Sequence, residues 1–352
     1  MNQQTLSKVG HNSQLYGAEV HRLCDGRAEG MKVVVLRNGR GLTATLAADR
    51  CLDPMRLEYK GDNLGFFSPA GWAAPQYYQP EEFLRNFTAG FMTTCGLESV
   101  GSDCEDQGER TVVHGRISNT PAQELNVHTD YSGHQPAVQV SGRMDEAVIF
   151  GGKLQLERTV TMPSDDNLLC FHDRVTNLGG EERPLMLLYH CNMGYPLLDE
   201  GVELLLPTLE VIPRDPRAAE GTSEYAQIPA PEAGFAEQCY YHRLGADAQG
   251  ISCAGIYNPR IGKGVLLSFD TAGLDQFTQW KMTGVRDYVL GLEPGNCRVE
   301  GRAKCREEGI LKTIRPGETV EFHLNIQILD GEGDLASARQ RICALRNGVA
   351  TA

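Results

Sequence analysis

Residues 320–328 alternate strictly between apolar and polar side chains, and this pattern constrains the fold more than any other feature of the sequence. The apolar positions are Val320, Phe322, Leu324, Ile326 and Ile328, and the polar positions between them are Glu321, His323, Asn325 and Gln327. This period of two predicts a β-strand with one buried face and one solvated face. Pro316-Gly317-Glu318 is typical of a tight turn, so residues 309–314 and 319–329 are predicted to form a hairpin.

Similar strand patterns recur along the chain, and its 39 glycines and 17 prolines separate them at short intervals. The further predicted strands are Met31–Leu36, Leu42–Ala47, Thr111–Ile117, Ala137–Arg143, Lys153–Met162, Asn167–Asn177, Leu185–His190, Gly264–Asp270, Phe277–Lys281 and Tyr288–Leu292. Residues 207–231 are rich in Pro, Glu and Ala, and we expect a long surface loop there.

Helical signals are few. Residues 80–84 can open one turn with Pro80 at the first helical position. Residues 334–346 predict a short amphipathic helix with Asp334 as its N-cap. The apolar face of this helix comprises Leu335, Ala338, Ile342 and Leu345.

The strands follow one another without a βαβ rhythm, so the sheet is expected to be antiparallel. The sequence predicts an all-β fold, a large antiparallel β-sandwich with few short helices. The 352 residues are expected to form a single domain, 1–352, with an N-terminal extension over 1–30 and a short C-terminal helix within 330–352. The alternative is two smaller β domains that meet near residues 207–235.

The charge balance excludes several classes of partner. There are 33 Lys and Arg against 46 Asp and Glu, a formal net charge of −13. Nucleic-acid binding requires a basic surface, and an acidic chain is repelled by anionic membranes. No apolar run approaches the roughly 18 residues that span a bilayer. Residues 1–10 lack the apolar region of a signal peptide, so we expect a cytoplasmic protein.

Cysteine usage and missing motifs narrow the chemistry. The 11 cysteines include no C-x-x-C pair, so we expect reduced and mostly buried thiols. The sequence has no phosphate-binding loop, no dinucleotide-binding glycine pattern, no nucleophile elbow and no H-E-x-x-H. These absences argue against nucleotide cofactors, α/β hydrolases and zincin proteases, and we expect no cofactor and no catalytic metal.

Three segments place a titratable group beside Gly or Pro near the end of a predicted strand, where sites are commonly built. They are Val112-Val113-His114-Gly115-Arg116, Leu187 to Pro196 with His190, and Tyr288 to Asn296 with Glu293. Histidine transfers protons near neutral pH, and burial of Glu293 would raise its pKa into the range of a general base. On residues alone, a structural role in ordinary hydrogen bonds, core packing or turn capping is the favoured interpretation of all three positions.

Two other groups are weaker candidates. His128 and His134 flank Asp130-Tyr131 and would supply nitrogen ligands for a metal, although their spacing matches no recognised ligand set. Cys95 is a conceivable nucleophile, but nothing nearby in the sequence would ionise its thiol. For both, a structural role is the favoured interpretation.

The three segments occur in the order found in the aldose 1-epimerase (galactose mutarotase-like) superfamily, and the sequence resembles an uncharacterised branch of it. Glu293 in Gly-Leu-Glu-Pro-Gly-Asn resembles the family's catalytic Glu, and His190 before Asn192-Met193-Gly194-Tyr195-Pro196 resembles its catalytic His. His114 in His-Gly-Arg and Arg85 in Phe-Leu-Arg-Asn-Phe resemble its sugar-binding residues. The family's well-studied members carry Asn-His-x-Tyr-Phe-Asn-Leu around the catalytic His, which differs here. For the family's sugar-binding Asp, the candidates are Asp270, Asp275 and Asp287.

The resemblance implies an isomerase that interconverts sugar anomers by ring opening. Glu293 would be the base and His190 the acid, while His114, Arg85 and Arg116 would hold hydroxyl groups and Trp280 would stack on the sugar. The partner would be a small-molecule sugar, and the protein a monomer or homodimer.

Two alternatives remain open. One is an epimerase or lyase that removes a proton α to a carbonyl of an oxidised sugar. The other is a carbohydrate-binding or sensing protein without catalysis, because a fold does not determine a function.

Overall fold

The computed structural model describes residues 7–132 and 136–348, so the predictions about residues 1–6, His134 and residues 349–352 lie outside the described part. Within the described residues, the strands form three large antiparallel sheets and three two-stranded ribbons. The predicted all-β fold with antiparallel sheets and few short helices is confirmed. No described helix has the length and apolar character needed to span a membrane.

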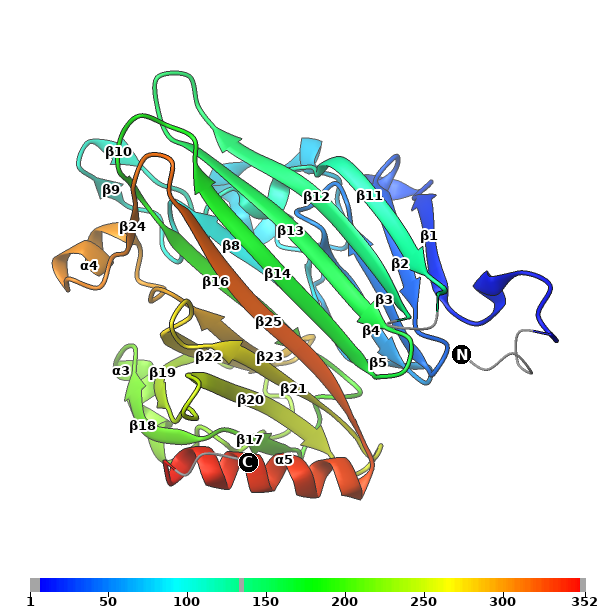
Figure 1. The fold of residues 1–352 in the computed structure, drawn as a ribbon. Coiled ribbons are helices and arrows are strands. Elements are labelled where there is room, and N and C mark those ends of the chain that lie inside the picture. The colour runs from blue at the N-terminus through cyan, green and yellow to red at the C-terminus, as the bar shows by residue number, and fades with distance from the viewer. Residues whose placement is uncertain (1–6, 133–135, 349–352) are drawn as a thin grey trace.

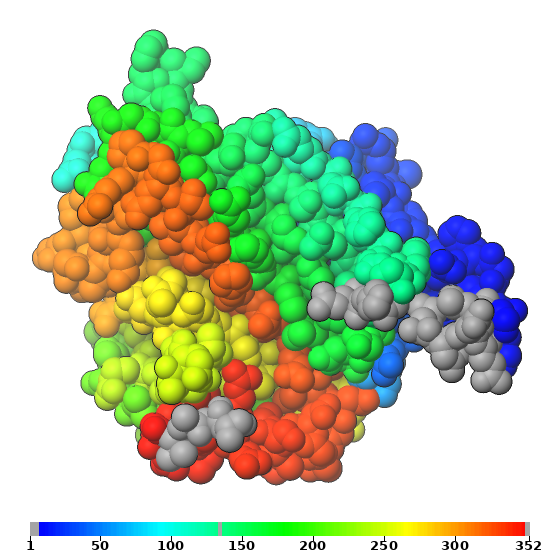
Figure 2. Space-filling model, viewed as in Figure 1, coloured from blue at the N-terminus to red at the C-terminus, as the bar shows by residue number. Residues whose placement is uncertain are grey.

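The largest sheet has eight strands and lies at the front of Figure 1. In spatial order they are β11 (Gln123–Asp130), β12 (Ala137–Ala147), β13 (Lys153–Pro163), β14 (Leu168–Asn177), β25 (Thr319–Asp330), β21 (Lys263–Asp270), β20 (Ile251–Asn258) and β17 (Glu203–Leu205). Buried and more accessible residues alternate along β13 and β14. One face of these strands therefore packs inward, and the other forms the molecular surface seen in Figure 2.

Two further sheets pack behind this one. The six-stranded sheet is β18 (Thr208–Pro213), β19 (Gln238–Leu244), β22 (Gln276–Gly284), β23 (Asp287–Gly295), β16 (Met186–Met193) and β8 (Met92–Leu97). The five-stranded sheet is β1 (Gly17–Arg22), β2 (Lys32–Arg37), β3 (Leu42–Ala47), β4 (Asp53–Tyr59) and β5 (Asp62–Asn63). The eight-stranded and six-stranded sheets each contain strands from before and after residues 207–235. A division into two β domains at that point would not give such sheets.

The remaining elements are short, apart from the last helix. The ribbons are β6 (Phe66–Phe67) with β7 (Ala89–Gly90), β9 (Glu105–Asp106) with β10 (Glu109–Arg110), and β15 (Arg183–Pro184) with β24 (Thr313–Ile314). The helices are α2 (Phe83–Asn86), α3 (Pro216–Glu220), α4 (Arg302–Glu307) and α5 (Glu332–Arg346). The 3₁₀ turns are η1 (Asn12–Gln14), η2 (Gly26–Ala28), η3 (Pro75–Tyr77), η4 (Pro80–Glu82), η5 (Ile117–Asn119) and η6 (Thr222–Glu224).

In the six-stranded sheet, β8, β16 and most of β23 are buried on both faces. On β16, Tyr189 and Cys191 belong to the main hydrophobic core, and on β23 so does Leu292. Because successive side chains of a strand point to opposite faces, His190 and Glu293 lie on the face that points away from this core.

A buried ion network joins the three sheets. Arg158 on β13 contacts Asp173 on β14, with Nη2 2.6 Å from Oδ2, and Asp53 on β4, with Nη1 2.7 Å from Oδ1. It also donates a 2.9 Å hydrogen bond to Thr94 Oγ1 on β8. The Tyr189 hydroxyl donates to Asp173 Oδ2 at 2.7 Å. The strand that carries His190 is thereby fixed to the opposite sheet.

Several local predictions are wrong. Residues 111–117 form turns instead of a strand, since His114 and Gly115 both adopt positive φ, 57° and 73°. A Cβ atom on Gly115 would lie 2.1 Å from the carbonyl oxygen of Gly96, so only glycine permits this close approach.

The predicted hairpin is also wrong, because β24 pairs with β15 while β25 pairs with β14 and β21. Residues 207–231 contain β18 and α3 instead of one long loop. The C-terminal helix is confirmed with its predicted buried face, but its N-cap is Gly331. Asp334 instead accepts a 2.9 Å hydrogen bond from the Asp330 amide.

Candidate functional site

Side chains from neighbouring strands form two rows across the outward face of the six-stranded sheet. The first row is Thr93 on β8, His190 on β16, Glu293 on β23, Thr278 on β22 and Tyr241 on β19. The second row, two residues along each strand, is Asn192, Gly291, Trp280 and Cys239. Strand pairing alone therefore brings a carboxyl group and an imidazole from distant parts of the sequence side by side.

A cavity of about 590 Å³ lies over these rows. Small-molecule sites commonly have volumes of about 300–1,000 Å³, so this one is large enough for a monosaccharide. His190, Glu293, Cys239 and Trp280 contribute from the sheet. The rest of the lining comes from residues 81–85 and Phe87 around α2, the loop 101–103, Val113, His114, Arg214, Glu237 and Val299.

His190 and Glu293 are in direct contact at the floor of the cavity. His190 Nε2 lies 3.2 Å from Glu293 Oε1, and the two residues are 5% and 1% exposed. Asn192 Nδ2 donates to the backbone carbonyl of His190 at 3.0 Å, which turns its Oδ1 toward His190 Nδ1 at 2.6 Å. An amide oxygen only accepts, so Nδ1 carries a hydrogen, and in the neutral ring the Nε2 lone pair faces Glu293.

Burial shifts both groups toward their neutral forms. It lowers the pKa of His190 to about 4, a shift that the hydrogen bond to Asn192 partly opposes. Burial raises the pKa of Glu293 well above its usual range; the nearby Glu237 raises it further and Arg214 lowers it. Both shifts favour the state in which the carboxyl group keeps its proton and the imidazole is neutral.

Gly291 provides the space that the Glu293 carboxyl group occupies. It lies two residues before Glu293 on β23, so the two positions share a face. A Cβ atom on Gly291 would lie 2.2 Å from Glu293 Oε1 and 3.0 Å from Trp280 Cβ. The missing side chain in the second row thus lets the carboxyl group lean along the strand.

His114 approaches the pair from the turn at residues 113–114. Its ring is edge-on to that of His190, with centroids 5.5 Å apart, and 5.2 Å from that of Phe83. The amide of Gly101 donates to His114 Nδ1 at 3.4 Å, so the neutral ring carries its hydrogen on Nε2. Burial, with a further effect of His190, lowers the pKa of His114 to about 3.

Arg214 and Glu237 form one wall of the cavity. Glu237 accepts 2.7 Å and 2.9 Å hydrogen bonds from Trp280 Nε1 and Arg214 Nη2. Arg214 Nε also donates to Asp215 at 2.9 Å. Both guanidinium groups in the lining are paired with carboxylates, because Arg85 Nε lies 3.3 Å from Glu82 Oε2.

Comparison with known proteins identifies the family. The model of a family described as a domain of unknown function, DUF4432, matches residues 28–328. This chain belongs to the DUF4432 family. No curated protein matches the sequence.

The fold of this DUF4432 chain is that of galactose mutarotase-like proteins, as the sequence resemblance implied. A crystal structure of a "putative aldose 1-epimerase" from Klebsiella pneumoniae matches with a TM-score of 0.89 and 26% identity over 99% of this chain and 92% of that one. A galactose mutarotase-like protein from Clostridium acetobutylicum matches with a TM-score of 0.63 and 15% identity over 90% and 99%. A galactose 1-epimerase from Lactobacillus acidophilus matches with a TM-score of 0.61 and 12% identity over 90% and 100%.

The site residues expected from the sequence of this DUF4432 chain fall into three groups. His190, Glu293, His114 and Trp280 meet at the cavity. The Arg85 side chain lines its mouth and is 78% exposed. Arg116 is exposed and is not part of the lining.

The weaker candidates lie elsewhere. His128 is on β11, and its proposed partner His134 is outside the described residues. Cys95 is fully buried, and burial raises the pKa of its thiol well above the usual range, which keeps it unreactive. In the described part of the chain, the His, Cys, Asp and Glu side chains that cluster with metal-ligand spacing are His172, Glu321 and His323, on the outer face of the eight-stranded sheet.

Four residues that the sequence analysis missed contribute to the site: Asn192, Gly291, Arg214 and Glu237. Asn192 and Gly291 could have been found from the sequence. Asn192 follows His190 by two residues and Gly291 precedes Glu293 by two residues, so each lies on the same face of its strand as the catalytic candidate. Arg214 directly follows β18, within residues 207–231 that were expected to be a loop, and Glu237 directly precedes β19. No local pattern indicated that they meet.

Proposed function

We propose that this DUF4432 protein is an aldose 1-epimerase that interconverts the anomers of a neutral sugar. The observation that carries the proposal is the contact between His190 Nε2 and Glu293 Oε1 at the floor of a sugar-sized cavity. The two oxygens that exchange protons in mutarotation are both bonded to the anomeric carbon. An acid and a base in direct contact can therefore reach both oxygens together.

The proton balance follows from the state of the pair. Hydroxyl groups of an entering sugar donate hydrogen bonds to the Glu293 carboxyl group and favour its ionised form, so its proton passes to His190 Nε2. Glu293 then takes the proton of the anomeric hydroxyl, while His190 gives its proton to the ring oxygen. The bond between the anomeric carbon and the ring oxygen breaks, and a carbonyl forms.

Rotation about the bond between C1 and C2 turns the other face of the carbonyl to the C5 hydroxyl. Ring closure returns both protons, with Glu293 as acid and His190 as base, and yields the other anomer. In this proposal, the neutral His114 donates to a sugar hydroxyl from Nε2, Trp280 packs against the sugar, and Arg85 contacts it at the cavity mouth. Arg116 has no assigned contact.

The charge of the lining favours a neutral sugar over an oxidised, anionic one. Glu81, Glu82, Asp103 and Glu237 are acidic, and both lining arginines are already paired with carboxylates. A sugar carboxylate would lose hydration here without gaining an unpaired cation. This argues against removal of a proton α to a carbonyl of a sugar acid.

The test is anomer exchange measured by NMR magnetisation transfer with galactose, glucose, xylose, fucose and deoxyribose. The wild type should accelerate exchange of at least one sugar, and Glu293→Gln and His190→Ala should each lose about 10²- to 10⁴-fold, the usual contribution of general acid–base catalysis. His21→Ala, which removes an exposed histidine outside the cavity lining, is the control. Sugar binding by all proteins without exchange by any would favour a binding or sensing protein.

A further inference from the structure

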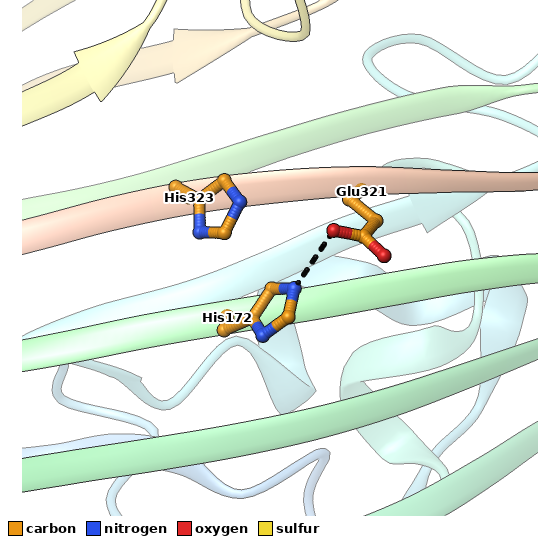
Figure 3. Close-up of side chains that lie close together, drawn as sticks. All are labelled: His172, Glu321 and His323. Carbon is orange, nitrogen blue, oxygen red and sulfur yellow. Dashed lines mark hydrogen bonds and ion pairs between the residues drawn. The ribbon is translucent and has the colours of Figure 1, made fainter.

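A second group of histidines lies outside the cavity lining, on the solvated face of the eight-stranded sheet. Figure 3 shows His172 on β14 with Glu321 and His323 on the neighbouring β25. Strand pairing sets His172 opposite His323, and Arg174 opposite Glu321. His172 and Glu321 are 149 positions apart in the sequence, so no local motif indicates the group.

We propose that His172, Glu321 and His323 bind a zinc-class divalent ion on this face. Each residue offers one ligand atom, and these atoms all lie within 4.8 Å of one another. Two imidazole nitrogens and one carboxylate oxygen are a ligand set that Zn²⁺ accepts, whereas Ca²⁺ and Mg²⁺ prefer oxygen alone.

The distances require little rearrangement. Ligand atoms at 2.0–2.2 Å from a tetrahedral ion lie about 3.4 Å apart. His172 Nε2 and Glu321 Oε2 are already 3.2 Å apart. The His323 ring stacks on the His172 ring, with centroids 4.5 Å apart and an interplanar angle of 15°, so a rotation of exposed side chains brings its nitrogen to the ion.

The surroundings orient the carboxylate. Arg174 Nε lies 3.3 Å from Glu321 Oε1, and Arg174 Nη1 is bound to Glu157 at 2.9 Å. The arginine therefore holds the far oxygen of Glu321 and leaves Oε2 toward His172, as outer partners of metal ligands commonly do. Its positive charge is shared with Glu157, so the group as a whole does not repel a cation.

The backbone beneath the group is rigid. Residues 168–176 of β14 pair continuously with residues 319–327 of β25, and both strands lie inside the eight-stranded sheet. Three ligands from two fixed strands leave at least one coordination position for water. An ion here would crosslink β14 to β25 without taking part in the proposed sugar chemistry.

Binding of Zn²⁺ alone can be measured by competition with a chelating dye. The wild type should bind one equivalent of Zn²⁺. His172→Ala, His323→Ala and Glu321→Gln should each increase the Kd by at least about 10- to 100-fold, which is the loss of affinity seen when even an outer partner of a metal ligand is removed. His21→Ala is the matched control, because His21 is also exposed and lies 3.3 Å from a glutamate, Glu19. Its Kd should equal that of the wild type.

Two results would overturn the proposal. One is the same Zn²⁺ affinity in the wild type and in all three variants. The other is a thiolate-to-metal charge-transfer band when Co²⁺ replaces Zn²⁺, because the first equivalent would then lie on an exposed cysteine such as Cys24 or Cys343. The three substituted side chains are solvent-accessible, so the metal-free variants should unfold at the wild-type temperature; if one does not, the other two decide the test.

Discussion

Gly291→Ala should disable the proposed reaction while leaving both His190 and Glu293 in the sequence. The new Cβ would lie 2.2 Å from Glu293 Oε1, whereas real Cβ atoms do not approach closer than 3.0 Å, so the carboxyl oxygen must move by at least 0.8 Å. A displacement of about 1 Å costs roughly 100-fold in rate, or about 2.7 kcal/mol of activation free energy. The expected loss in anomer exchange is therefore about 100-fold.

The assay is the rate of anomer exchange, measured by NMR with the sugar that the wild type exchanges fastest. The melting temperature of each protein is measured alongside. Gly180→Ala is the control, because no heavy atom lies within 4 Å of a Cβ at that position, and it should exchange sugars at the wild-type rate. Folded Gly291→Ala protein with exchange within about threefold of the wild type would refute the reasoning, since the space above Gly291 would then be irrelevant to Glu293.

Three further outcomes follow from the same contacts. Asn192→Leu removes the acceptor of the hydrogen bond from His190 Nδ1 and should reduce the rate of anomer exchange by about 10²- to 10⁴-fold. Asn192→Asp should instead shift the pH–rate profile to higher pH. An unchanged profile would argue that Asn192 does not position His190. Arg158→Met leaves two buried carboxylates without a counterion and should lower the free energy of unfolding by about 3–5 kcal/mol in urea titrations. Part of this stability should return at low pH. Arg174→Met, which removes an exposed arginine, should lower the free energy of unfolding by less than about 1 kcal/mol. In the folded protein, burial lowers the pKa of His190 to about 4 and that of His114 to about 3, from the ordinary value of 6.5. As pH drops from about 6.5 to about 3, the unfolded chain therefore binds protons first, and the free energy of unfolding should fall. Replacing both histidines by Gln should flatten this pH dependence in urea titrations across the same range.

The sequence predicted best the strands that have one face in solvent. Lys153–Met162 and Val320–Ile328 alternate because water selects polar residues on one side, and both lie within the observed β13 and β25. Met92–Leu97 was missed because it is buried on both faces, so no alternation marks it. At residues 111–113 the β-branched run favoured a strand, but packing of the following glycine against Gly96 imposes a turn.

The site was predictable residue by residue but not as an assembly. Glu293 and His190 each stand beside turn residues and resemble family positions, which is local information. Their contact depends on the pairing of β16 with β23, and pairing partners are not encoded in either strand alone. The wall formed by Arg214 and Glu237 depends in the same way on β18 and β19.

The floor of the cavity is formed by buried strands and its rim by a short exposed segment, and this difference has an evolutionary consequence. His190 and Glu293 lie on strands that are buried on both faces, where almost any substitution disturbs the core. The rim around α2 is short, and apart from Phe83, which packs against His114, its residues 81–85 are exposed, Leu84 by 83%. Replacements of Glu81, Glu82, Leu84 and Arg85 should therefore leave the folding free energy nearly unchanged. Diversification confined to these four positions would vary the choice of ligand while retaining the proton-transfer pair, and a mutant library limited to them is an efficient starting point for changing specificity.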